Sequence, residues 1–298
     1  MVSSHTMRTA VVGPGAIGTV VAALLHEAGT PVLVAGRSPR PDLRLDTERG
    51  AIVVPGPVLT DPARSPGAAD VVFLAVKATQ TAATAAWLSA LCGPATVVCV
   101  LQNGVEQVES VQPLVAGSDV VPAIVWSPAE RRPDGSVRLR GEPRFTVPRV
   151  GGAERVGRVL EATACEFTIA DDFTTLAWRK LLQNAAAGLM ALTGRRAGMF
   201  RRDDVADLAL AYLRECLAVA RACRAALPDD EPDRVLQRFR GFPDDMGTSI
   251  LADREAGRPL EWDVRNAVIR RRGREHGIPT PVSDVLVPLL AAASDGPG

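Results

Sequence analysis

Three glycines, Gly13, Gly15 and Gly18, occur at the spacing Gly-x-Gly-x-x-Gly between an apolar run and a helical pattern. The run is Thr9 to Val12, and the helical spacing extends from Ile17 to Ala28. In a strand, turn and helix of this kind, the first glycine permits the tight turn, the second lets the backbone approach a pyrophosphate, and the third lets the helix pack on the strand. The N–H groups at the start of the helix then face the phosphates. We therefore expect a dinucleotide to bind this loop through Gly13, Gly15, Ala16, Ile17 and Gly18.

The end of the second predicted strand bears on which dinucleotide binds. Val32 to Ala35 is apolar, and Arg37 and Ser38 follow it closely. An NAD site usually has an acidic residue here for the ribose hydroxyls, whereas an NADP site supplies cations for the 2′-phosphate. Arg37 can make a bidentate phosphate contact and Ser38 can donate beside it, with Arg40 as a helper. The sequence thus favours NADPH; a merely exposed arginine in an arginine-rich chain is the alternative.

Apolar runs alternate with helical spacing through the first half of the chain. After the first two strands come the runs Val71 to Val76, Val97 to Leu101 and Val120 to Val125, with a helical stretch at Thr79 to Leu91. Such alternation is typical of a parallel sheet with helices on both faces. The predicted fold class is α/β, with an N-terminal Rossmann domain built on a doubly wound sheet.

The second half has a different pattern. A segment between residues 128 and 152 is rich in Pro, Gly and Arg, and its short alternations predict irregular antiparallel edge strands at Ser136 to Leu139 and Arg144 to Val147. After Asp172, amphipathic helical spacing replaces the strand pattern. We expect an NADP-binding Rossmann domain over residues 7–170 and an all-helical substrate or catalytic domain over residues 171–298. The predicted helices lie near Thr174 to Leu192, Val205 to Ala226, Leu260 to His276 and Val282 to Ala293.

The charge balance and the cysteines limit the class of partner. The 298-residue chain carries 34 basic and 34 acidic residues in mixed order, which favours a small-molecule partner over nucleic acid or an anionic membrane. Five cysteines form no Cys-x-x-Cys pair and no cluster with the three histidines, so we expect reduced cysteines, no metal and a cytoplasmic location. No window reaches the roughly 18 to 20 apolar residues of a membrane span. Residues 1–6 are unlike a signal peptide and precede the first predicted strand.

A nicotinamide enzyme that reduces a carbonyl needs a proton donor, and most candidate groups can be excluded. The one tyrosine, Tyr212, has a cysteine four residues later, so the Tyr-x-x-x-Lys pair of short-chain dehydrogenases is absent. His5 precedes the fold and His26 lies in the first helix. His276, near the chain end, keeps a minor claim to a site role. The lysines remain as donors.

Lys77 and Lys180 are the only lysines in the chain. Arginine can replace a solvated lysine charge but cannot release a proton near neutral pH, so a proton-donating lysine resists replacement. Lys180 and Asn184 share a helical face, and desolvation in a cleft between the domains would lower the lysine pKa toward that of a general acid. Lys77 and Asn103 follow sheet strands at the carboxyl ends, where α/β sheets bind ligands. Surface exposure of Lys77 and helix capping by Asn103 are the alternatives.

With these residues in place, the sequence resembles the ketopantoate reductase (2-dehydropantoate 2-reductase) family over nearly its whole length. Members of the family share a series of motifs in this order along the chain: the glycine loop, an Arg after the second strand, Lys-Ala, Asn-Gly, Trp-Arg-Lys with an Asn four residues after the Lys, and then a Ser and a Glu in the last third. This chain supplies Gly13 to Gly18, Arg37, Lys77-Ala78, Asn103-Gly104, Trp178-Arg179-Lys180, Asn184, Ser249 and Glu261, with a closing segment at Arg274 to Pro281.

The resemblance implies an NADP-dependent oxidoreductase that reduces a 2-oxo acid, ketopantoate or a related compound, to the 2-hydroxy acid, as in pantothenate biosynthesis. Lys180 would be the general acid, and Glu261 would hold Lys180 or a substrate hydroxyl. A carboxylate near Lys180 is sensible because it stabilises the ammonium that donates. The implied substrate ligands are Asn184, Ser249 and Asn103, and Lys77 and Asn103 border the cofactor.

Two positions depart from the family pattern, since Gly188 and Gly198 stand where the family often has asparagine. Loss of an amide in a desolvated site can cost about 1 to 3 kcal/mol, enough to change which oxo acid is preferred. A β-hydroxyacid dehydrogenase or imine reductase-like enzyme is one alternative, which Trp178, Arg179 and Glu261 disfavour. A catalytically silent NADP-binding regulatory protein is the other. The oligomeric state stays open, with a homodimer as one option.

Overall fold

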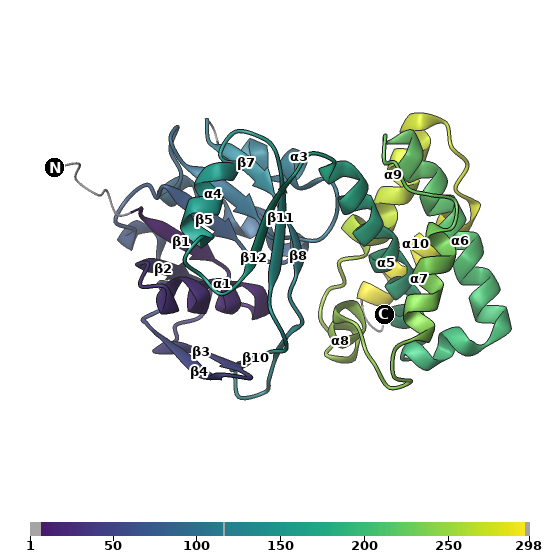
Figure 1. Ribbon diagram of the computed structural model, residues 1–298, viewed down its shortest axis with the longest axis horizontal. Helices are drawn as coiled ribbons and strands as arrows, with labels where there is room; N and C mark the ends of the chain where they lie inside the picture. Colours follow the sequence, from purple (N-terminus) through teal and green to yellow (C-terminus); the bar gives the residue numbers. More distant parts are fainter. Residues whose placement is uncertain (1–6, 116, 296–298) are drawn as a thin grey trace. The chain divides into compact units, whose positions relative to one another are not determined.

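The computed structural model describes residues 7–115 and 117–295 (Figure 1). The chain forms two compact units. The first unit contains the residues up to Gln102 together with Glu106–Phe173, and the second contains Asn103–Val105 and the chain from Thr174 onward. The chain thus enters the helical unit after Phe173, near the predicted boundary after residue 170. The roles predicted for the two domains stay predictions, and residues 1–6 lie outside the described part.

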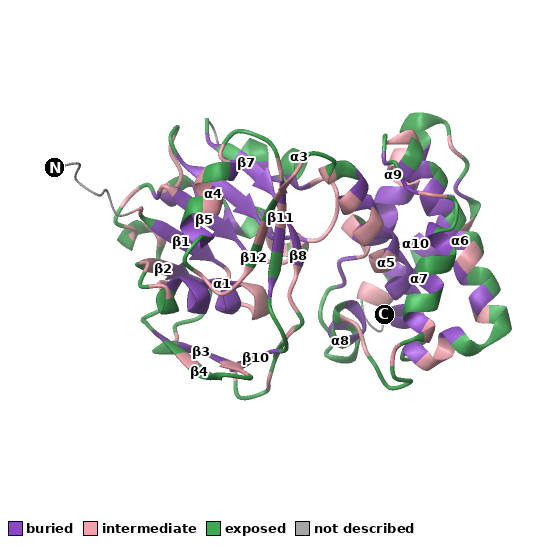
Figure 2. Cartoon of the chain, in the orientation of Figure 1, coloured by how far each residue is buried: buried purple, intermediate pink, exposed green. Residues whose placement is uncertain are grey.

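The core of the first unit is a five-stranded parallel sheet with the order β2-β1-β5-β6-β7. The chain first adds β2 on one side of β1 and then adds β5, β6 and β7 on the other side, which is the arrangement of a doubly wound sheet. Strands β1, β5 and β6 are buried along their whole length, as their unbroken apolar runs predict. Figure 2 shows much of this sheet in the purple of buried residues. The strands are β1 (Thr9–Val12), β2 (Val32–Ala35), β5 (Val71–Leu74), β6 (Val97–Val100) and β7 (Asp119–Pro122).

Helices cover both faces of this sheet. Alternate residues of each strand join one of two apolar clusters: Val11 packs with α1 and α4, whereas Val12 packs with α2 and α3. This alternation follows from the two-residue period of a strand. The helices are α1 (Ala16–Glu27), α2 (Ala85–Leu91), α3 (Gln107–Val111) and α4 (Ala153–Leu160). The predicted α/β fold class, a Rossmann sheet followed by a helical C-terminal part, is confirmed.

The helix predicted at Thr79 to Leu91 is wrong in its first half. Two 3₁₀ turns, Ala78–Gln80 and Ala82–Thr84, come first, and the α-helix begins only at Ala85. Threonine hydroxyls account for the difference, because Thr81 donates to the carbonyl of Ala78 at 3.0 Å and Thr84 donates to that of Thr81 at 2.7 Å. Such local hydrogen bonds compete with the regular helix.

The predicted edge strands are strands, but they are not edges. β10 (Val137–Leu139) lies between β3 and β9 in a second sheet, and β11 (Arg144–Pro148) lies between β12 and β8 in a third. Each has one parallel and one antiparallel neighbour. Local alternation shows that a strand is half-buried but does not identify its partners. The remaining strands are β3 (Asp42–Thr47), β4 (Gly50–Pro55), β8 (Ile124–Trp126), β9 (Ala129–Arg131) and β12 (Glu166–Ala170).

The second unit is helical in its described part, and α5 is its central element. Twelve of the residues of α5 are buried, among them Trp178 and Leu182. The segment predicted as one helix from Leu260 to His276 contains a π-helical turn, Asp263–Ala267, before α9. No described helix is long and apolar enough to cross a membrane. The helices are α5 (Phe173–Thr193), α6 (Asp203–Ala222), α7 (Glu231–Arg240), α8 (Ser249–Glu255), α9 (Val268–His276) and α10 (Pro281–Asp295).

Candidate functional site

The glycine loop of the first unit is closely packed at two of its glycines and open at the third. Gly13 has a φ of +99°, which disfavours any side chain, and a Cβ atom at Gly18 would overlap the carbonyl oxygen of Gly13. A Cβ atom at Gly15 would meet nothing within 4 Å. The protein itself therefore needs the first and third glycines, whereas the second faces open space. That space, at the N-terminus of α1, fits the phosphates of a dinucleotide.

Basic side chains follow β2 near this loop. Arg37 and Ser38 are exposed, while Arg40 is half-buried and donates from Nη1 to the carbonyl of Pro14 at 3.2 Å. Burial, and then the nearby Arg131 guanidinium, lowers the pKa of Arg40. Arg131 on β9 is a further cation of this region that the sequence pattern did not reveal, because it belongs to a separate sheet.

Lys77 lies at the carboxyl end of β5, and the loop that carries it is fixed by hydrogen bonds. The amide of Gln80 donates to the carbonyl of Lys77 at 2.8 Å. Gln102, buried at the end of β6, donates from Nε2 to the carbonyl of Val76 at 3.1 Å and to Thr81 Oγ1 at 2.8 Å. These hydrogen bonds connect the loop after β5 to the loop after β6. Lys77 is half-buried in the first of these loops.

In the second unit, α5 carries Lys180 and Asn184 one turn apart, and both are half-buried. The Asn184 Nδ2 atom lies 3.5 Å from Asn103 Oδ1, and Asn103 Nδ2 donates to Glu261 Oε2 at 3.1 Å. Asn103 was predicted from its position after a strand and Asn184 from its position on a helix. The structure connects both to Glu261, Asn103 directly and Asn184 through Asn103. Asn103 and Glu261 are 158 residues apart in the sequence, so only the fold brings these polar groups together.

A buried ion pair completes this group. Arg265 donates from Nη2 to Glu261 Oε2 at 2.9 Å and to Ser249 Oγ at 3.0 Å. The side chains of Glu261 and Arg265 are only 4% and 2% exposed. We call Asn103, Lys180, Asn184, Ser249, Glu261 and Arg265 the polar cluster. Sequence reasoning missed Arg265, whose one signal is its position four residues after Glu261 in an arginine-rich chain.

The surroundings of Lys180 shift its pKa strongly. Burial, followed by the Arg265 guanidinium, lowers its pKa from the ordinary 10.5 to about 7, and the Glu261 carboxylate acts in the opposite direction. A lysine with this pKa exists in both protonation states near neutral pH. It can therefore give up a proton and be recharged without a large free-energy cost, which is the property of a general acid.

The two family departures lie in different surroundings. A Cβ atom at Gly188 would come within 2.6 Å of Asn266 Nδ2. Asn266 is fully buried and donates to the carbonyl of Ala185 at 3.1 Å and to the hydroxyl of Tyr212 at 3.0 Å. Gly198 instead lines an open pocket of about 900 Å³ together with neighbours from the end of α5 and the start of α6. An asparagine at position 188 therefore needs Asn266 to move.

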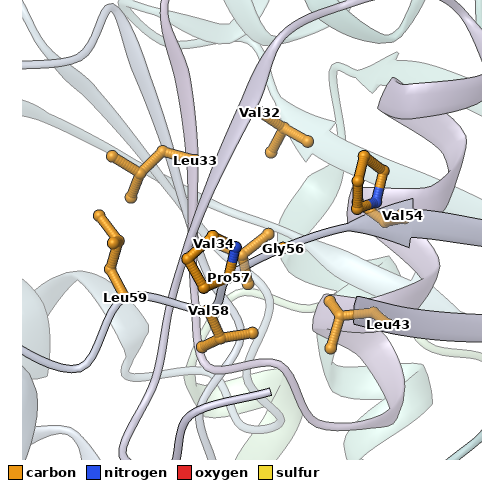
Figure 3. Close-up of a pocket in the computed structure, with 10 residues that line it drawn as sticks. Val32, Leu33, Val34, Leu43, Val54, Gly56, Pro57, Val58 and Leu59 are labelled. Carbon is orange, nitrogen blue, oxygen red and sulfur yellow. The ribbon is translucent and has the colours of Figure 1, made fainter. Parts of the chain in front are cut away.

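A separate apolar pocket of about 220 Å³ lies beside β2 in the first unit. Figure 3 shows aliphatic side chains and prolines around it, from β2, β3, β4 and the loop that follows. None of the residues that line it is ionisable. It carries none of the chemistry described above.

The remaining candidates contribute little. His276 is exposed in the last turn of α9. The five cysteines are free thiols, and burial raises the pKa of Cys99 to about 12. Within residues 7–115 and 117–295, no group of His, Cys, Asp and Glu side chains could hold a metal ion.

The sequence matches the models of one protein family over most of its length. Family models described as "Ketopantoate reductase PanE/ApbA" and its C-terminal counterpart match residues 9–152 and 172–294. A 2-dehydropantoate 2-reductase of Mycobacterium tuberculosis is 60% identical over 97% of this chain and 98% of its own length.

Solved structures give the same result. A PanE/ApbA family ketopantoate reductase from Ralstonia eutropha has a TM-score of 0.86 at 30% identity, over 97% of this chain and 99% of that one. A dimeric ketopantoate reductase from Staphylococcus aureus has a TM-score of 0.88 at 24% identity, over 98% and 100% of the two chains, which shows the fold. From its glycine loop to its polar cluster, the chain belongs to the ketopantoate reductase family of NAD(P)-dependent oxidoreductases that act on CH–OH groups.

Proposed function

We propose that this chain reduces a 2-oxo acid, ketopantoate or a related compound, to the 2-hydroxy acid, with NADPH as the reductant and Lys180 as the general acid. The observation that carries the proposal is the half-buried Lys180, with a pKa lowered to about 7, in the polar cluster with Glu261 and Asn103. The 60% identical relative named 2-dehydropantoate 2-reductase supports the same substrate class.

The cofactor assignment rests on the first unit. The open space at Gly15 and the N-terminus of α1 suit the pyrophosphate, and Arg37, Ser38 and Arg40 suit a 2′-phosphate rather than free ribose hydroxyls. Lys77, at a strand end, would border the cofactor. When bound, NADPH supplies the hydride that reaches the carbonyl carbon of the substrate.

The residues of the second unit supply the proton and the substrate contacts. The Lys180 ammonium donates a proton from Nζ to the carbonyl oxygen as negative charge develops there, and the neutral amine then takes a proton from solvent. Glu261 stabilises the ammonium before it donates. Asn103, Asn184 and Ser249 orient the substrate through hydrogen bonds.

The test is oxidation of NADPH by the purified protein with a panel of 2-oxo acids that includes ketopantoate, cyclic imines and 3-oxo acids. Turnover of 2-oxo acids is the expected result. Activity with imines alone would select the imine reductase-like alternative, and binding of NADPH without any turnover would select a regulatory protein. The homodimer and the cytoplasmic location stay predictions.

A further inference from the structure

Arg265 differs from the other arginines of the chain in its surroundings. It is the bulkiest of the fully buried described side chains, and it lies on the π-helical turn Asp263–Ala267. Its Nε atom is buried and has no hydrogen-bond partner among the residues that the structure describes. Burial of a charge costs free energy unless the charge is paired and hydrogen-bonded. A cation that stays here with incomplete hydrogen bonding indicates a role beyond packing.

The first contact of Arg265 determines what Ser249 can do. A guanidinium is a donor only, so the hydroxyl of Ser249 must accept in the 3.0 Å hydrogen bond from Arg265 Nη2. The single proton of this hydroxyl then remains for another acceptor. Ser249 is exposed at the start of α8, whereas the positive charge behind it is buried. An acceptor with negative charge, such as a carboxylate, fits a donor that is backed by a cation.

The second contact determines how Glu261 acts on Lys180. The same Nη2 atom of Arg265 donates to Glu261 Oε2 at 2.9 Å, and Asn103 donates to that oxygen as well. Glu261 is therefore already paired, and its attraction for the Lys180 ammonium is offset by the repulsion from Arg265. Arg265 thus acts on the proton donor through charge and on the substrate ligand through a hydrogen bond.

Two charged groups of one segment act on Lys180. Arg265 and Glu261 both shift the pKa of Lys180, in opposite directions. Two buried ionisable side chains of α6 have other partners. Tyr212 accepts from the side-chain amide of Asn266, and Glu215 accepts from backbone N–H groups at the start of α10.

We propose that Arg265 is a positioning and specificity-determining residue: it aligns Ser249 to donate to the carboxylate of the substrate, and it prevents Glu261 from serving as a counter-ion for Lys180 alone. The proposal rests on the proposed function, because it assumes that the substrate is a 2-oxo acid. It adds that acid substrates are preferred over their uncharged amides because of a cation that itself makes no contact with them.

The experiment compares wild type, Arg265→Met and the double variant Glu261→Gln/Arg265→Met, which leaves no unpaired buried carboxylate. Kinetics with a 2-oxo acid and its amide give the discrimination, the ratio of the two kcat/KM values. We expect this ratio to fall about 10-fold or more in both variants, mainly through a higher KM for the acid. Arg179→Met is the matched control, because Arg179 pairs at 3.2 Å with the nearly buried Glu231 on α7. Its ratio should match wild type.

A second readout needs no turnover. The chain has two lysines, so protein labelled with ¹³C-lysine gives two side-chain signals, which Lys77→Arg assigns. In Arg265→Met, the pKa of Lys180 should rise by about one unit or more, because a repelling charge is lost and Glu261 is unopposed. If wild type reduces no 2-oxo acid, the proposed function fails, while this titration still tests the link to Lys180. If wild type does so and both the titration and the discrimination are unchanged, the role of Arg265 is overturned alone.

Discussion

The glycine loop of the first unit and the polar cluster of the second are built in opposite ways. The loop is contiguous, needs glycine at Gly13 and Gly18 for its own packing, and has open space at Gly15. The cluster uses side chains from four separate segments, and its ion pair is almost fully buried. A binding site made of backbone can be recognised from a short stretch of sequence, whereas a site made of side chains becomes visible only when the fold brings them together.

The largest effect should come from the cluster. Lys180→Ala removes the proposed proton donor and is expected to lower kcat by about 10²- to 10⁴-fold, with binding of NADPH nearly intact. Steady-state kinetics and a fluorescence titration of NADPH measure the two effects. Unchanged turnover would remove Lys180 from the mechanism.

The loop region should respond in binding rather than in turnover. Arg37→Ala is expected to weaken NADPH by about 10- to 100-fold, because charge-assisted hydrogen bonds to the 2′-phosphate are lost, and to affect NADH far less. Arg49→Ala, an exposed arginine between β3 and β4, is the control. Equal losses for NADPH and NADH would contradict the assignment of the phosphate contact.

The pH dependence should separate the two regions again. Reduction needs Lys180 protonated, and its pKa is about 7, so kcat/KM should be highest below this pH and fall about tenfold per unit above it. Affinity for NADPH, measured over the same range without substrate, should not follow this profile. A rate that stays constant from pH 6 to 9 would sink the role of Lys180 as the acid.

The smallest effects should come from the glycines of the loop. Substitution of Gly18 should lower stability, whereas substitution of Gly15 should weaken NADPH binding. Gly18→Ala overlaps the carbonyl oxygen of Gly13 and should cost about 1 to 3 kcal/mol of stability. Gly15→Ala meets no protein atom within 4 Å, so the melting temperature should stay close to wild type while NADPH binds more weakly. Calorimetry with and without NADPH distinguishes them. A Gly15→Ala variant that binds NADPH normally would argue against a close approach of the phosphates.

Sequence patterns predicted the elements that obey one periodicity, and they failed where side chains decide. The buried runs of β1, β5 and β6 could be recognised because unbroken apolar stretches suit a covered parallel sheet. The start of α2 was missed because the hydroxyls of Thr81 and Thr84 close 3₁₀ turns instead. The partners of β10 and β11 are distant in the chain, so local alternation could not identify them.

The candidate site shows the same limit. The scarcity of lysine drew attention to Lys180, and helical spacing added Asn184. Arg265 was invisible among 34 basic residues, because its burial and its contact with Ser249 depend on the fold. The obstacle at Gly188 was equally hidden, since it comes from Asn266 on another helical segment.

The short segment Asn103–Val105 belongs to the second unit although the chain before and after it belongs to the first. A gene fragment that encodes only residues from Thr174 onward would therefore lack Asn103, the amide that donates to Glu261. The helical half therefore cannot be transferred alone to another protein with its site intact. Joined to the sheet of a different dehydrogenase, it would lose this hydrogen bond unless that sheet also carried an asparagine after its fourth parallel strand. Within such a family, exchanging the whole gene should therefore preserve the site more often than exchanging the helical half alone.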